Sequence, residues 1–221
     1  MTAGHDQDGS PYQAVLGDDL AGLHPRLQAY FSAIPADHHG FGRGVFDTVG
    51  TPRRWLWPAL ALLSRAGVVF PVWEHDVSFT VVNRPAGTPH AVTADRFFVL
   101  RRGSRHMRDV ISADGPGPGS GPRLRDRLGS PPRLDAQLEA AVVAGALRLR
   151  STRVTYLAGS LRIPFPRLIA PVVELTESYD DALDSQRVSL TVRAPFIGTI
   201  YQYAGSFVYE IRRGEPAGEG E

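Results

Sequence analysis

Apolar residues near the N-terminus recur every three or four positions, as they do along one face of a helix. This spacing predicts helices over residues 12–17 and 24–34, and an apolar stretch at 52–66 predicts a third, buried helix. From residue 72 onward the period falls to two, which is typical of strands that bury one face.

The period-two segments predict one large antiparallel sheet. A loop at 37–44 precedes the first strand, and Gly103-Ser104 is expected to form a two-residue hairpin turn, with glycine supplying a positive φ. About eight to ten strands are too many for a flat open sheet. The predicted fold class is therefore α+β, with a strongly curved sheet, a barrel or half-barrel, and N-terminal helices. The expected strands cover residues 45–49, 72–83, 91–102, 105–112, 137–143, 146–156, 188–192 and 199–211.

Composition divides the chain into a core and two polar ends. Residues 1–10 and 212–221 are predicted to be disordered, and residues 11–211 to form a single domain. The low-complexity stretch 113–122 (ADGPGPGSGP) is expected to be a mobile loop inside that domain, because strand patterns of the same kind resume beyond it.

Two residue types are missing, and their absence excludes several kinds of chemistry. All 24 basic residues are arginines, and there is no lysine and no cysteine in 221 positions. Without lysine there is no Schiff-base catalysis, no covalent pyridoxal phosphate and no Walker-type phosphate lysine. Without cysteine there is no thiolate nucleophile, disulfide or iron–sulfur cluster. No motif requires a cofactor, so none is predicted.

The charges are balanced and dispersed along the chain. The net charge is +1, and the arginines are spread rather than clustered, which disfavours nucleic acid as a partner. Residues 1–10 are polar and acidic, unlike a signal peptide or an import sequence. The sequence therefore predicts a cytoplasmic protein.

Residues 55–73 (WLWPALALLSRAGVVFPVW) are about as long as a membrane span. Two prolines, a glycine and Arg65 interrupt the segment, and an arginine near the middle of a span costs about 2.5–3.5 kcal/mol. We therefore expect a short buried helix followed by a strand. Contact with a membrane surface is disfavoured, and a helix that lies on a membrane stays open as the alternative.

Three segments, taken in order, resemble one bacterial protein family. The first is residues 12–31 (YQAVLGDDLAGLHPRLQAYF), in which His24 precedes a proline. The second motif, W-x-R-x-F, falls at Ala94, Arg96 and Phe98. The third motif, G-x-x-x-x-Y-x-G, falls at Gly198, Tyr203 and Gly205. Over residues 11–211 the chain resembles the uncharacterised family called domain of unknown function 4166.

The resemblance implies an accessory or ligand-binding role and assigns no catalytic residue. Family members occur alone or behind a nicotinamide-dependent reductase domain similar to saccharopine dehydrogenase, so such a reductase is an implied partner. The chain departs from the family at Ala94, where the second motif has tryptophan. This departure removes an aromatic ring that could stack on a ligand.

Histidines are the candidate acid–base residues. His24 stands at a predicted helix start, where a capping or packing role is the simpler interpretation. His38-His39 lack further ligands at helical or strand spacing, so no metal site is predicted. His75 lies between two acidic residues on an apolar strand face. It could act as a general base inside a barrel or be a hydrogen-bonded core residue.

Arg96 carries the sharpest single-residue prediction. It lies in a strand among bulky apolar residues, and a guanidinium group away from water must be paired. We expect it to face the interior, where it either forms a structural ion pair or anchors an anionic group. Asp95 points to the opposite face, so the partner must come from another strand. The available carboxylates are Glu74, Asp76, Glu139 and Glu174.

The last strand carries several aromatic residues on one face, and these could form core or line a cavity. The preferred hypothesis is a non-catalytic module that holds a hydrophobic or amphipathic small molecule, with Arg96 fixing a carboxylate or phosphate group. An acid–base enzyme that uses His75 or His24, and a structural or protein-interaction domain, remain alternatives. The aromatic wall residues would be Trp73, Tyr201, Tyr203 and Phe207.

Overall fold

A computed structural model describes residues 9–115, 121–166 and 168–214 of the chain. Most of the two ends predicted to be disordered, and the middle of the predicted loop 113–122, lie outside these ranges. The helical elements are α1 (Pro11–Leu16), η1 (Gly17–Gly22), α2 (Pro25–Phe31), η2 (Arg54–Leu56) and α3 (Trp57–Ser64). The strands are β1 (His38–Gly50), β2 (Trp73–Glu74), β3 (Val77–Pro85), β4 (Ala91–Leu100), β5 (Gly103–Asp114), β6 (Arg123–Leu128), β7 (Leu134–Val143), β8 (Ala146–Ala158), β9 (Leu161–Pro164), β10 (Val172–Asp180), β11 (Ser185–Ala194) and β12 (Gly198–Arg213).

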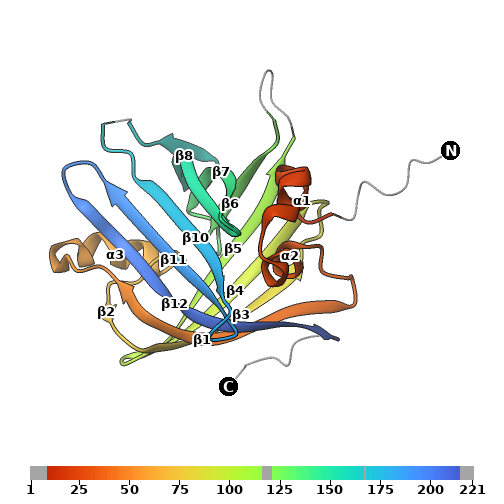
Figure 1. Ribbon diagram of the computed structural model, residues 1–221. Helices are drawn as coiled ribbons and strands as arrows, with labels where there is room; N and C mark the ends of the chain where they lie inside the picture. Colours follow the sequence, from red (N-terminus) through yellow and green to blue (C-terminus); the bar gives the residue numbers. More distant parts are fainter. Residues whose placement is uncertain (1–8, 116–120, 167, 215–221) are drawn as a thin grey trace.

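The sheet closes on itself as an antiparallel barrel of ten strands (Figure 1). The order is β10-β11-β12-β1-β3-β4-β5-β6-β7-β8, and β8 pairs with β10 to complete the ring. Strands β2 and β9 are short additions that pair with β1 and β8. The predicted α+β class and curved sheet are confirmed, and the sheet forms a full barrel.

The helices lie at opposite ends of the barrel (Figure 1). Helices α1 and α2 cover one end, which we call the closed end; there the His24 amide donates to the Gly145 carbonyl in the β7–β8 turn. Helix α3 lies at the other end, which we call the mouth. We define the mouth as residues 51–72, 168–171 and 193–198, which follow β1, precede β10 and join β11 to β12.

Local signals at the helix starts distinguish the two ends. Ser10 and Gln13 form a reciprocal capping box that begins α1, and the Ser10 hydroxyl also donates to the Phe31 carbonyl. The His24 ring caps α2 by accepting from the Arg26 amide. Helix α3 begins without a side-chain cap and continues directly from η2, where the Trp57 amide donates to the Arg54 carbonyl.

Strand β1 begins seven residues earlier than the sequence predicts, and the expected loop at 37–44 is wrong. Glycines in this segment suggested a loop, but they belong to a strand that packs closely against β12. A Cβ atom on Gly40 would lie 1.5 Å from the Tyr209 hydroxyl, and one on Gly44 would lie 2.1 Å from the Ser206 carbonyl oxygen. The glycines therefore make room for the aromatic face of β12.

Three further elements differ from the sequence prediction. The β4–β5 turn falls at Arg101-Arg102 rather than at Gly103-Ser104, and Gly103 begins β5 with φ +100°. The expected strand from residue 72 is interrupted by two exposed residues, of which Asp76 has a positive φ. Strand β12 continues to Arg213, past the predicted start of the tail. Strands β6, β9 and β10 were not predicted.

Two groups of apolar side chains fill part of the barrel. One is centred on β1, β3, β4 and β12, and includes the stacked rings of Phe46 and Phe79, 3.8 Å apart. The other joins α1 and α2 to β6, β7 and β8, with Leu27 and Leu147 fully buried. The space between these two groups is not filled by side chains.

Candidate functional site

A cavity of about 510 Å³ lies inside the barrel, with a lining from both ends and from the strands between them. Its volume is within the range of roughly 300–1,000 Å³ that is usual for small-molecule sites. Tyr12 and Tyr30 enter the lining from α1 and α2, and Leu60 and Leu63 enter from α3. The cavity thus runs from beneath the N-terminal helices to the mouth.

The wall of the cavity is mainly aliphatic. Strands β7 and β8 contribute one side, and β10 to β12 contribute the other. Such a lining favours an apolar occupant, because burial of apolar surface is worth about 25 cal/mol per Å². The principal apolar wall residues from the strands are Leu134, Ala136, Leu138, Leu149, Val154, Val173, Leu175, Leu190 and Val192.

A small group of charged side chains lies in this otherwise apolar space. Arg96 on β4 pairs with Asp109 on β5, and its side chain is 18% exposed, toward the cavity that it lines. Asp126 on β6 and Glu177 on β10 also line the cavity. We call these four residues the polar cluster. It contains three carboxyl groups and one guanidinium group, so acceptors outnumber cations.

Three side chains that line the cavity each have a buried oxygen atom with no hydrogen-bond partner among the described residues. The atoms are Oδ1 of Asp126, Oδ1 of Asn83 and the hydroxyl oxygen of Tyr201. The Asn83 amide nitrogen donates to the Tyr209 hydroxyl at 3.4 Å, and Gln186 donates to Glu177. A buried acceptor without a donor is costly, so the two Oδ1 atoms favour an occupant that donates hydrogen bonds, and the Tyr201 hydroxyl can donate one in return.

Burial changes the protonation of the polar cluster. Removal from water raises the pKa of Glu177 to about 7, although the hydrogen bond from Gln186 and the charge of Arg96 act in the opposite direction. Burial, and secondarily the charge of Asp109, raises the pKa of Asp126 well above its ordinary value. Near neutral pH the carboxyl groups of Glu177 and Asp126 therefore hold protons part or most of the time, while Arg96 carries a positive charge.

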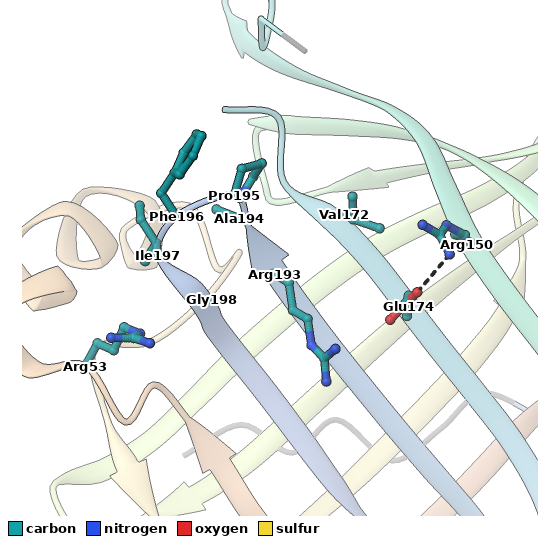
Figure 2. Close-up of a pocket in the computed structure, with 10 residues that line it drawn as sticks. All are labelled: Arg53, Arg150, Val172, Glu174, Arg193, Ala194, Pro195, Phe196, Ile197 and Gly198. Atoms are coloured by element: carbon teal, nitrogen blue, oxygen red, sulfur yellow. Dashed lines mark ion pairs between the residues drawn. The ribbon is translucent and has the colours of Figure 1, made fainter. Parts of the chain in front are cut away.

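A second, shallower hollow of about 590 Å³ opens at the mouth (Figure 2). Arg53 and Arg193 lie on opposite sides of the β11–β12 hairpin tip, and an ion pair of 3.2 Å joins Arg150 to Glu174 beyond it. This hollow shares Ala194 and Ile197 with the inner cavity. The two spaces therefore meet at the hairpin.

The structure brings together three of the six ligand-binding candidates. Arg96, Tyr201 and Tyr203 line the cavity. Phe207 is buried in the apolar core, where it packs edge-on against Phe79. Trp73 lies on the short strand β2, half-buried, outside the cavity lining.

The histidine candidates lie outside the cavity. His75 is exposed between β2 and β3, and its Nδ1 atom is 3.0 Å from the Asp47 carbonyl oxygen, so the prediction that it shares the inward face of a continuous strand is wrong. His24 caps α2 and stacks on Tyr179, with ring centres 4.6 Å apart. No histidine lines the cavity within the part of the chain that the structure describes.

The two motif glycines have backbone roles. Gly198 begins β12 at φ +78°, and a Cβ atom there would lie 3.0 Å from an Arg53 nitrogen. Gly205 faces an irregular part of β1, where a Cβ atom would lie 2.2 Å from the Val45 carbonyl oxygen. Gly205 therefore marks a close approach of two strands.

The sequence patterns did not identify the three carboxylates of the polar cluster. Asp109 pairs with Arg96, and none of the four proposed partners does: Glu174 pairs with Arg150, and Glu74 accepts from the Arg101 amide. The hairpin register could have identified Asp109. Because Arg96 lies opposite Met107, the residue two places further along β5 shares its face.

No group of three or more histidine, aspartate or glutamate side chains is placed to hold a metal ion in residues 9–115, 121–166 and 168–214. No helix within those ranges has the length and apolar character that crossing a membrane requires.

The family of the chain follows from the segment that builds the barrel. The model of a protein family described as Domain of unknown function (DUF4166) matches residues 23–207, from the end of η1 into β12. The chain belongs to the DUF4166 family. The DUF4166 match includes all four residues of the polar cluster, and it leaves out α1, which supplies Tyr12 to the cavity.

A bacterial protein is similar to this DUF4166 chain over most of its length. The chain is 24% identical over 198 residues to the uncharacterized protein YndH of Bacillus subtilis (strain 168), covering 86% of this chain and 92% of YndH. No solved structure matches the chain.

Proposed function

We propose that this DUF4166 barrel binds a hydrophobic or amphipathic small molecule in its inner cavity. The observation that carries the proposal is an enclosed, largely aliphatic cavity of about 510 Å³ that contains a few convergent polar groups. A barrel wider than eight strands has room for more than its own side chains, and eight-stranded barrels already hold one small ligand.

The polar cluster suggests which end of the ligand enters first. Tyr12 and Tyr30, which come from the closed end, lie within electrostatic reach of Glu177 and Arg96, so the cluster is near that end. The ligand's polar group therefore lies beneath α1 and α2, and its apolar part extends toward the mouth.

The charges of the cluster refine the chemistry of that polar group. Arg96 was expected to fix a carboxylate or phosphate group, but Asp109 already neutralises it. An additional anion would find no unpaired cation among the described residues that line the cavity. A hydroxyl or amino group, by contrast, would donate to the unpartnered Oδ1 atoms of Asp126 and Asn83. We therefore propose an apolar ligand with a hydroxyl or amino group.

Displacement of a fluorescent apolar probe, phenylnaphthylamine, tests this proposal. We expect the probe to bind, and dodecanol and dodecylamine to displace it at least tenfold better than dodecanoate. The variant Val92→Trp, which places a large ring in the cavity wall, should abolish probe binding. The matched control Val99→Trp lies on the same strand but is 61% exposed on the outer face, and it should bind normally. A probe that does not bind, or binds Val92→Trp equally well, would refute the proposal.

Acid–base catalysis is the second candidate, now with carboxyl groups instead of histidines. Glu177, with a pKa of about 7, faces an apolar cavity that Asp126 also lines, and general acids and bases use such surroundings. Mass spectrometry of a bound ligand after prolonged incubation separates the candidates. An unchanged ligand mass together with unchanged chromatographic retention supports simple binding, and a change that Glu177→Gln abolishes supports catalysis.

A further inference from the structure

Large apolar side chains are exposed around the mouth. Phe196 is 95% exposed, Leu168 76%, Leu62 69% and Trp55 63%. Each of these four residues has a direct neighbour in the sequence that lines the inner cavity, so they surround its opening. The lining neighbours are Leu56, Leu63, Ile169 and Ile197.

Phe196 is exposed at a cost to the backbone. It projects from the tip of the β11–β12 hairpin (Figure 2) and has φ +62°, the left-handed region that favours glycine or asparagine. A bulky side chain in this conformation costs about 1 kcal/mol or more. The fold gains nothing from a ring that packs against no neighbour, so the conformation and the exposure together point to a role outside the fold.

The apolar residues of the mouth are accompanied by arginines and by no acid. The segments 51–72, 168–171 and 193–198 contain no aspartate or glutamate, and they contribute Arg53, Arg54, Arg65 and Arg193. None of these four arginines forms an ion pair with a described residue. Exposed aromatic and aliphatic groups with unpaired arginines match the chemistry of a bilayer surface with anionic headgroups.

We propose that the mouth docks on the surface of an anionic lipid bilayer. The four exposed apolar side chains enter the interface, and the arginines contact the phosphate groups. A second copy of the chain is a poorer occupant, because symmetric contact through the mouth would place the same arginines opposite one another. A bilayer also dissolves apolar small molecules, so docking would bring the cavity opening to a source of its ligand.

Vesicle co-sedimentation of the full chain tests this inference. We expect binding to vesicles of phosphatidylcholine with phosphatidylglycerol, much weaker binding to phosphatidylcholine alone, and a decline with salt. The double variant Leu62→Ser/Phe196→Asn should lose at least tenfold in affinity. Arg54→Gln and Arg193→Gln should each lose about fivefold, since an arginine near an anionic surface contributes about 1 kcal/mol.

The control is an exposed leucine at the closed end, comparable in exposure to Leu62. Leu183 is 63% exposed in the β10–β11 turn, and Leu183→Ser should leave vesicle binding unchanged. Circular dichroism melting should show all variants folded, because the substituted side chains are exposed. Equal loss in Leu183→Ser and the double variant would overturn the inference, as would absence of binding to anionic vesicles at low salt. A concentration-dependent dimer that Phe196→Asn abolishes would assign the mouth to a second copy instead.

Probe displacement in detergent-free solution keeps this inference distinct from the proposed function. Leu62→Ser/Phe196→Asn should bind phenylnaphthylamine normally while failing to bind vesicles. Val92→Trp should behave in the opposite way, because its substitution lies in the wall of the inner cavity.

Discussion

The two ends of the barrel differ in how they are covered and charged. At the closed end, α1 and α2 begin with side-chain caps, and acidic residues in the β10–β11 turn pair with them: His24 with Asp181 and Arg26 with Asp184. At the mouth, α3 lacks a side-chain cap, and arginines and apolar side chains are exposed. Interactions within the chain are concentrated at one end, and groups suited to external contacts are at the other.

The largest expected effect comes from removing the cation of the polar cluster. Arg96→Met should lower the free energy of unfolding by about 3–5 kcal/mol at pH 8, because buried Asp109 is left unpaired. Urea denaturation provides the measurement. Arg193→Met at the mouth, an exposed residue, should change stability by less than about 0.5 kcal/mol. Similar losses in both variants would contradict the distinction between the interior near the closed end and the mouth.

A second test uses pH. The folded-state pKa of Glu177 is about 7, above the ordinary 4.5, so the folded state binds the proton more tightly. Its contribution to stability is fully present below about pH 4.5 and is lost as pH rises to about 7, a change of roughly 3 kcal/mol. Asp126 acts in the same direction. Glu177→Gln should flatten the decline, measured by denaturation from pH 5 to 8, whereas Glu139→Gln, on the exposed part of β7, should not.

The smallest expected effect concerns the cap of α1. Ser10→Ala removes the hydroxyl that accepts from the Gln13 amide and donates to the Phe31 carbonyl, and it should cost about 1 kcal/mol. Hydrogen exchange should accelerate in α1 and α2, while α3 keeps its rate. Faster exchange throughout the barrel would mean that the closed end is not a separate stable unit.

The sequence predicted the barrel class better than it predicted the polar cluster. Period-two patterning identified β3, β4, β5, β7, β8, β11 and β12, because each buries one face. Strand β6 (RLRDRL) was missed since charged residues occupy most of its positions, and β10 was missed although it carries alternating apolar residues. These two strands supply Asp126 and Glu177, so the sequence pattern could not place two of the four cluster residues in the barrel.

The partner of Arg96 was missed for a different reason. Placing the β4–β5 turn at Gly103-Ser104 puts Arg96 opposite Ile111, whereas the observed turn puts it opposite Met107. Asp109 lies two places from the opposite residue in both registers and shares the face of Arg96 in both. It was missed because the four carboxylates proposed as partners include none from β5, the strand that pairs with β4.

The pairing of β1 with β12 has a consequence for how the protein folds. His38 lies beside Arg213, so the barrel is sealed by strands from near the two ends of the described chain. Loop closure over such a sequence separation is slow, and every other pairing in the ring can form before it. During synthesis the cavity cannot become enclosed until β12 has left the ribosome. Until then the edges of β1 and β11 are exposed to strand addition by other chains.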